Sequence, residues 1–365
     1  MTVKKPLTGE KRKPQRKRVN RPLTGEKRKS ERKKVKKPLS HKIPVVKPNI
    51  ITAKWKRHVQ KNPEEGLKIL TASPRTQYVS LFLTKELIGG TECHPRIKNQ
   101  YGEMKHAGIY YIRNAYGRSY ITCNYEGVTM QRPGLPPLVD SSCAEHIKDC
   151  LINSTLTVLY LNIILPPNIG HANLLMIQKI LNKRLNRHEY FIYRIEPHGG
   201  FYYTQDHINL DLSITNEIIT FMKNVVFENE PNKPQFHYVS PRITCPSKNF
   251  LLRGKQEYTG VQHLEDAKYK QKIDDTGFCS FWSFWIKLIA LYNRKSGKHS
   301  ANAHKTAYRY LKQKNGPEQR MNFIRNFAKL LRLIEFDSMG KDEKGIEKVV
   351  KKYKDYIKTE SLIFV

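Results

Sequence analysis

The segment 280–293 (SFWSFWIKLIALYN) constrains the fold most, because apolar side chains lie on almost every face of the helix that it predicts. A helix of this kind is stable only where other elements cover it on several sides. The chain can supply that cover, since 39% of its 365 residues are hydrophobic and 10% are aromatic. The sequence therefore predicts a globular region built around a buried helix.

Runs that mix aromatic and β-branched residues predict β-strands before this helix. They cover residues 78–88, 108–122, 151–165 and 190–195. The largely apolar run 151–165 is typical of a strand buried on both faces. After the buried helix, the segments 303–314, 317–336 and 342–359 predict amphipathic helices rich in Lys and Arg. Strands come first and helices last, so we expect a mixed α+β fold.

Residues 1–50 form a strongly basic repeat. The copies 3–18 and 19–34 agree at 11 of 16 positions, and residues 1–50 hold 19 Lys and Arg against three Glu, which contributes +16 of the formal net charge of +34. Such a small number of apolar residues cannot offset the entropy lost on ordering, so we expect a disordered tail. Its chemistry favours binding to the phosphates of nucleic acid, most simply DNA. A localisation address, an acidic protein partner or a solubilising role are the alternatives.

Secretion and membrane insertion are not expected. The first residues are polar and basic, unlike a signal peptide. The longest uncharged run, 150–178, is interrupted by polar residues and prolines, so no membrane span is expected. Six cysteines without a Cys-x-x-Cys pair predict reduced thiols in a cytosol-like compartment. One cysteine-rich cluster allows either a zinc site or partly buried helix residues; it consists of Cys143, His146 and Cys150, with Cys123 or His94.

Cys279 follows Gly277 at the predicted start of the buried helix. The unpaired amides and the dipole at a helix N-terminus stabilise a thiolate, and the same amides can bind an oxyanion. These properties suit a nucleophilic cysteine. The alternative is a small core residue that packs beside its aromatic neighbours.

A nucleophilic cysteine needs a base and usually an acid that orients the base. His171 follows the turn at Pro166 and Pro167, and Glu196 ends the predicted strand 190–195, so neighbouring strands can bring the two together. Gln262 carries a side-chain amide suited to binding an oxyanion. His198, between Pro197 and Gly199, is an alternative base.

Four blocks in order carry a resemblance to a known family: GHANLLMIQK (170–179), RIEPHGG (194–200), TGVQ (259–262) and GFCSFWSFW (277–285). They resemble the His, acid, Gln and Cys blocks of the papain-like cysteine proteases that include adenovirus protease and the SUMO-specific proteases. More closely, the combination is similar to a protein group encoded by large nucleocytoplasmic DNA viruses.

The resemblance implies a papain-like core, in which the buried helix carrying the cysteine packs on a mixed sheet. It implies Cys279 as nucleophile, His171 as base, Glu196 as the orienting acid and Gln262 as the oxyanion donor, with no metal or organic cofactor. The expected organisation is a tail at 1–50, an N-terminal part of the globule at 51–150, a protease-like core at 151–300 and C-terminal helices at 301–365.

The function implied is thiol-dependent cleavage of peptide or isopeptide bonds by a viral protein that its tail tethers to nucleic acid. Protein substrates or virion proteins are the expected partners, and the virion, the host cytoplasm or a viral factory the expected location. The alternative is a catalytically inactive virion structural or DNA-packaging protein with the same fold. The two differ in one testable property, because only catalysis requires a reactive and accessible Cys279.

Overall fold

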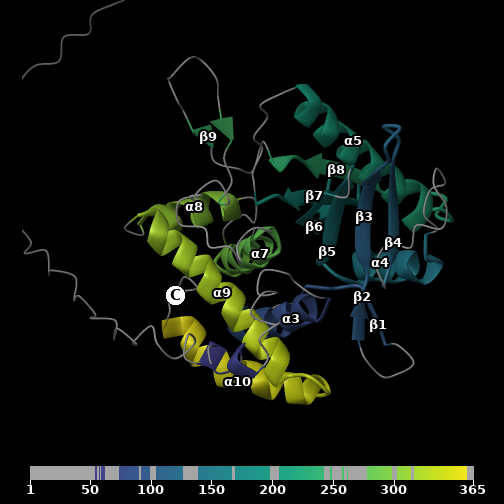
Figure 1. Ribbon diagram of the computed structural model, residues 1–365. Coiled ribbons are helices and arrows are strands. Elements are labelled where there is room, and N and C mark those ends of the chain that lie inside the picture. Colours follow the sequence, from purple (N-terminus) through teal and green to yellow (C-terminus); the bar gives the residue numbers. More distant parts are fainter. Residues whose placement is uncertain are drawn as a thin grey trace, which may run out of the picture. The chain divides into compact units, whose positions relative to one another are not determined.

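The computed structural model divides the chain into two units, Met1–Ile43 and Pro44–Val365, and every residue that it describes lies in the second (Figure 1). The predicted tail at 1–50 lies outside the described residues. These residues are 54–55, 57, 59–61, 74–89, 92–98, 104–125, 139–166, 169–197, 205–241, 247–248, 257–258, 261, 278–297, 302–313 and 316–359.

A six-stranded mixed sheet organises this unit, with the strand order β4-β3-β5-β6-β7-β8. The pairs β3–β5 and β7–β8 are parallel, and the other neighbours are antiparallel. Its strands are β3 (Gly108–Arg113), β4 (Ser119–Asn124), β5 (Leu156–Leu165), β6 (Ile169–Asn182), β7 (Arg187–Ile195) and β8 (Gln235–Val239). Separate antiparallel pairs are formed by β1 (Arg96–Lys98) with β2 (Met104–His106), and by β9 (Ser247–Lys248) with β10 (Glu257–Tyr258).

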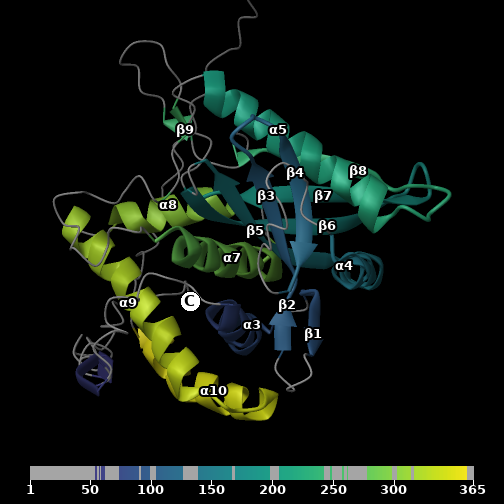
Figure 2. The same cartoon turned by 45° about the vertical axis from the view of Figure 1, so that its right-hand side comes forward.

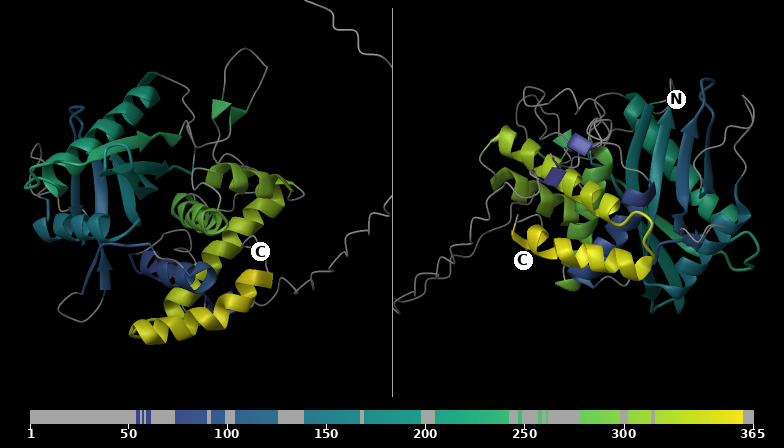
Figure 3. Two further views of the ribbon diagram at one scale, coloured as in Figure 1. Left: turned by 180° about the vertical axis from the view of Figure 1, so that it is seen from behind. Right: turned by 60° about the horizontal axis from the view of Figure 1, so that its bottom comes forward.

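Helices cover both faces of the sheet, which confirms the mixed α+β class (Figures 2 and 3). One face packs against α4 (Ser141–Asn153), α5 (Gln205–Phe221) and the π-helical turn η1 (Met222–Val226). The other face packs against α7 (Cys279–Lys295). Outside α7 lie further helices: α3 (Pro74–Ile88), α8 (Ala303–Gln313), α9 (Pro317–Asp337) and α10 (Glu343–Thr359). Helices therefore alternate with strands along the chain instead of all following them.

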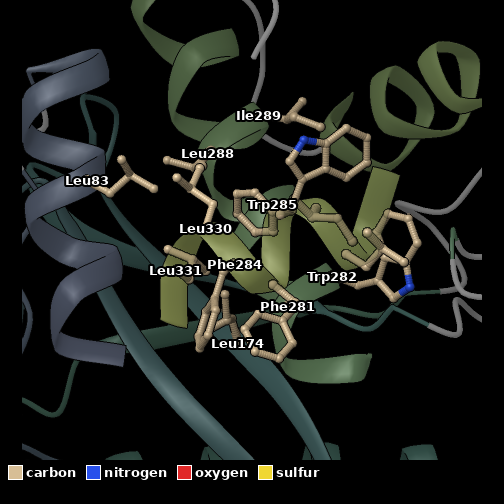
Figure 4. Packing of buried hydrophobic residues seen from close by; sticks show 14 of the residues in the cluster. Leu83, Leu174, Phe281, Trp282, Phe284, Trp285, Leu288, Ile289, Leu330 and Leu331 are labelled. Carbon is tan, nitrogen blue, oxygen red and sulfur yellow. The ribbon is translucent and has the colours of Figure 1, made fainter. Parts of the chain in front are cut away.

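Helix α7 is buried between the sheet and the outer helices, as its apolar sequence predicts (Figure 4). Trp282 and Trp285 are almost completely buried, and Leu174 of β6 lies in the same cluster of apolar side chains. Burying large aromatic side chains on all faces fixes the position of the helix on the sheet. The residue at its start, Cys279, is therefore held against β6.

Strand β5 is apolar because both of its faces are covered. Val158 packs on the α7 side, whereas Leu159 and Leu161 pack on the side of α4 and α5. Residues 151–153, which their apolar sequence assigns to the strand, instead form the last turn of α4. Ser154 ends that helix, so the strand begins only at Leu156.

The prediction of a strand at 78–88 is wrong, because these residues lie in helix α3. Its buried side chains include Val79, Phe82 and Leu83, whose spacing of three and four residues marks one face of a helix. Aromatic and β-branched composition suggested a strand, but burial at this helical period decides the local structure.

The expectation that all cysteines are reduced is also wrong, since Cys93 and Cys150 form a disulfide with their Cα atoms 5.4 Å apart. The backbone of Cys93 bonds to Leu156 and Val158 of β5, and Cys150 lies in the last turn of α4 just before that strand. The fold thus brings together two residues 57 positions apart, which spacing alone does not reveal. Cys123, Cys143 and Cys279 are free.

The described residues include no group of three or more His, Cys, Asp or Glu side chains that could hold a metal ion. In the cluster considered as a zinc site, Cys150 is bonded to Cys93, and His146 hydrogen-bonds the hydroxyl of Tyr125. Within the same part of the chain, none of the helices is long and apolar enough to span a membrane.

Candidate active site

The stagger between β6 and β7 brings His171 and Glu196 together. His171 is the third residue of β6 and pairs with Ile163 of β5, whereas β7 pairs with β6 only from Leu174 onward. Glu196 directly follows β7, whose last residue, Ile195, is paired with Leu174. The carboxylate therefore lies beside the start of β6, on the edge that β7 does not pair with. Its Oε1 is 2.5 Å from His171 Nε2.

Cys279 reaches the same point from α7. Its sulfur hydrogen-bonds the His171 side chain, and the backbone N–H of Ala172 also donates to it. One helical turn further, the Ser283 hydroxyl donates to the Ala172 carbonyl oxygen at 3.2 Å. Ala172 thus bonds α7 through both of its backbone groups, and these bonds hold the first turn of the helix against β6. Three residues from three separate parts of the chain form one hydrogen-bonded series.

The His171 imidazole is held as a cation. Burial lowers its pKa, but the charge of Glu196, together with the hydrogen bonds to Cys279 and Glu196, outweighs burial and raises the pKa to about 10. Only 20% of the side chain is exposed, so solvent screens the neighbouring carboxylate weakly. At neutral pH this imidazole carries its proton.

The Cys279 thiol has the opposite shift. Burial raises its pKa, whereas the hydrogen bond and the charge of His171, with the N–H of Ala172, lower it, and the net direction is below the ordinary value for a thiol. Cys279 is partly exposed, unlike the buried Cys123 and Cys143. It therefore combines access to solvent with a stabilised thiolate.

The start of α7 adds a fixed electrostatic contribution. Cys279 is the first residue of the helix, no side-chain hydrogen bond caps this end among the described residues, and the first turn carries no acidic residue. The amides and the positive end of the helix dipole therefore face the thiolate without a competing anion from the helix itself. Such amides can also stabilise an oxyanion that forms next to the sulfur.

Arg194 is a further residue of this site, and the sequence reasoning missed it. Its guanidinium donates to the second oxygen of Glu196, Oε2, at 3.3 Å. A signal was available, because residues 194 and 196 lie two positions apart along an extended segment and so point to the same side. Gln262, the expected oxyanion donor, and His198, the alternative base, lie outside the described residues.

No protein-family model matches this chain, and no curated protein is significantly similar to it. Similar solved structures include the Legionella pneumophila effector protein RavZ in complex with human LC3B, which is 9% identical over 75% of this chain and 72% of RavZ with a TM-score of 0.30. A second RavZ structure is 10% identical over 79% of this chain and 90% of RavZ with a TM-score of 0.29. We draw no functional conclusion from similarities as low as these.

Proposed function

We propose that this chain is a thiol-dependent hydrolase with a papain-like core, in which Cys279 attacks the carbonyl carbon of a peptide or isopeptide bond. The observation that supports the proposal is the hydrogen-bonded series from Cys279 through His171 to Glu196. These residues are far apart in sequence. Their hydrogen bonds connect a nucleophile, Cys279, to a base, His171, and the base to an orienting acid, Glu196.

The chemistry follows from the charges in this series. The Cys279 thiolate adds to the carbonyl carbon, and the oxygen becomes an oxyanion that the amides at the start of α7 can bind. The carbon–nitrogen bond then breaks, and the His171 imidazolium gives its proton to the leaving amine, which leaves a thioester on Cys279. Neutral His171 next takes a proton from water, whose oxygen attacks the thioester and releases the acid. Glu196 keeps the imidazole oriented throughout.

Alkylation of the thiols tests the proposal without a known substrate. At neutral pH, iodoacetamide should label Cys279 faster than Cys123 or Cys143, as peptide mapping by mass spectrometry measures. His171→Ala should slow the labelling of Cys279 by about tenfold or more, because each unit by which a thiol pKa rises above the ambient pH lowers its thiolate fraction about tenfold.

The pair His237 and Glu189 provides a matched control, since His237 Nε2 lies 3.2 Å from a Glu189 carboxylate oxygen on the same sheet. His237→Ala should leave the labelling of Cys279 unchanged. If Cys279 resists labelling in the folded chain, or if both His variants slow it equally, the inactive virion scaffold becomes the better account of this fold.

The proposal includes the segment outside the described residues. We propose that residues 1–50 tether the hydrolase to DNA through phosphate contacts, and that it acts on protein substrates or virion proteins. The support is the net charge of +16 in a repeated, apolar-poor segment. The resemblance to proteins of large DNA viruses supports a location in the virion, the host cytoplasm or a viral factory.

Deleting residues 1–48 should weaken binding to duplex DNA of any sequence. The full-length protein should also show a steeper decline of affinity with salt, because each neutralised phosphate adds close to one unit to the slope of log affinity against log salt. Fluorescence anisotropy over a salt series measures both quantities. Equal affinities and equal slopes for the two proteins would point to an acidic protein partner or a localisation address.

A further inference from the structure

We infer that Arg194 is a positioning residue of this site, which keeps Glu196 ionised and turned toward His171. The inference rests on the proposed function and deepens it. Arg194 bonds the Glu196 carboxylate, which bonds His171, and His171 in turn lowers the pKa of Cys279. The effect of Arg194 on the thiol that we infer passes through this carboxylate.

The two oxygens of Glu196 have different partners. Arg194 donates to Oε2, while Oε1 lies against His171. The NH1 group of Arg194 also donates to the Asn173 side-chain oxygen at 3.1 Å. Because a planar guanidinium donates in fixed directions, these contacts fix the rotation of the carboxylate. Oε1 is thereby left to face the imidazole.

Arg194 is itself held by a residue on the face of the sheet opposite α7. Its NH2 group donates to Asp211 of α5 at 2.6 Å, and the second oxygen of Asp211 accepts from Ser240 at 2.8 Å. Helix α5 covers the face opposite α7. Glu196 is thus held from the α5 side of the sheet, while the nucleophile approaches from the α7 side. At the ends of β6 and β7, a continuous series of acidic and basic side chains is formed by Asp211, Arg194, Glu196 and His171. We call this series the ion chain.

Charge explains why Arg194 matters for the thiolate. Glu196 is buried, and a buried carboxylate is costly unless cations compensate it. With Arg194 present, Glu196 stays ionised and the shared proton stays on His171. Without Arg194, the carboxylate would compete for that proton, and the resulting neutral imidazole would no longer stabilise the thiolate. Removing this cation from the ion chain should therefore slow the reaction at Cys279.

Among the described residues, titratable groups of α8 and β8 also face the ion chain. His304 of α8 is buried, and burial lowers its pKa to about 4 against the opposing charge of Glu196, so it is neutral at neutral pH. Tyr238 of β8 lies near Arg194 and Asp211, and burial raises its pKa above the ordinary value, so it too is neutral. Neither supplies a cation that could replace Arg194.

A double-mutant cycle tests the inference, with iodoacetamide labelling of Cys279 between about pH 5 and 9 as the readout. Arg194→Met removes the charge and roughly keeps the length of the side chain. At neutral pH it should slow labelling by about tenfold or more, and it should move the labelling profile to higher pH. In a Glu196→Gln background the same change should have little effect, because no carboxylate remains to compete for the proton.

Arg332→Met is the matched control, because Arg332 is similarly buried and bonds Glu335 at 2.7 Å within α9. It should leave the pH profile of Cys279 unchanged. Circular dichroism checks folding, and if Arg194→Met does not fold, the cycle is run with Arg194→Gln, which also removes the charge but keeps hydrogen-bond donors, and the same slowing is expected. Equal slowing by the Arg194 substitution with and without the Glu196 carboxylate would overturn the inference and leave Arg194 a structural residue.

The two proposals fail in distinguishable ways. If Cys279 of the unaltered protein is not labelled preferentially, the proposed function fails before the cycle begins. If Cys279 is labelled preferentially and His171→Ala slows the reaction, but Arg194→Met does not, only the role of Arg194 is overturned.

Discussion

The protein should release a burst of 4-nitrophenolate from 4-nitrophenyl acetate, and replacing Cys279 with alanine should abolish that burst. This activated ester acylates a reactive thiolate whatever the natural substrate is, so the burst counts sites that form a thioester. We expect acylation to slow by about 10³-fold or more, because the loss of a nucleophile removes most of the rate enhancement of such a site. Stopped-flow absorbance measures the burst.

Cys123→Ala is the control for this experiment, since Cys123 is a buried free thiol on β4 of the six-stranded sheet. It should keep a full burst of one equivalent per chain. A burst that survives Cys279→Ala and disappears with another cysteine would move the nucleophile elsewhere and refute the proposed site.

Glu196→Gln should lower the pKa of His171 far below the value of about 10 that the carboxylate sustains. The sign follows from the charges: the carboxylate stabilises the imidazolium, and once it is gone burial favours the neutral ring. The thiolate then loses its cationic partner, so the pKa of Cys279 rises. Labelling of Cys279 should be slower than in the unaltered protein near neutral pH, and the two rates should converge in alkaline solution, where the thiol is ionised in both.

Two measurements check this prediction. Nitrogen-15 NMR of the histidine rings follows the titration of His171, and iodoacetamide labelling over the same pH range follows Cys279. Glu189→Gln serves as the control, because Glu189 bonds His237 instead. Unchanged titration of His171 in Glu196→Gln would show that Glu196 is not the group that holds its proton.

Much of the fold could be predicted where burial leaves a regular pattern. The apolar runs of β5 and α7 are long, and elements covered on both sides have few other ways to bury such residues. The sequence of helix α3 predicts a strand because its aromatic and β-branched residues suit either structure, and only the packing partners decide between the two. Pairing of Cys93 with Cys150 depends on where α4 ends relative to β5, which is a tertiary property.

In the candidate site, too, some features could be predicted from the sequence and others depend on tertiary packing. Cys279, His171 and Glu196 could be selected from the sequence because each stands close to the end of an element, where side chains from different elements can meet. The distances among them depend on the stagger of β6 and β7 and on the seating of α7. The spacing of two residues between Arg194 and Glu196 indicates their contact, whereas the contact of Arg194 with Asp211, which belongs to a helix on the face of the sheet opposite α7, leaves no local pattern in the sequence.

Because the site is divided between β6 and α7, it can form only late in the synthesis of the protein. During synthesis His171 leaves the ribosome long before Cys279, and the outer layer that encloses α7 is complete only when α10 packs against α3. Before α7 packs on β6, Cys279 lacks the His171 and Ala172 partners that lower its pKa. The proposed hydrolase would therefore be inert as a nascent chain, and it could not cleave neighbouring proteins before α7 has packed on β6.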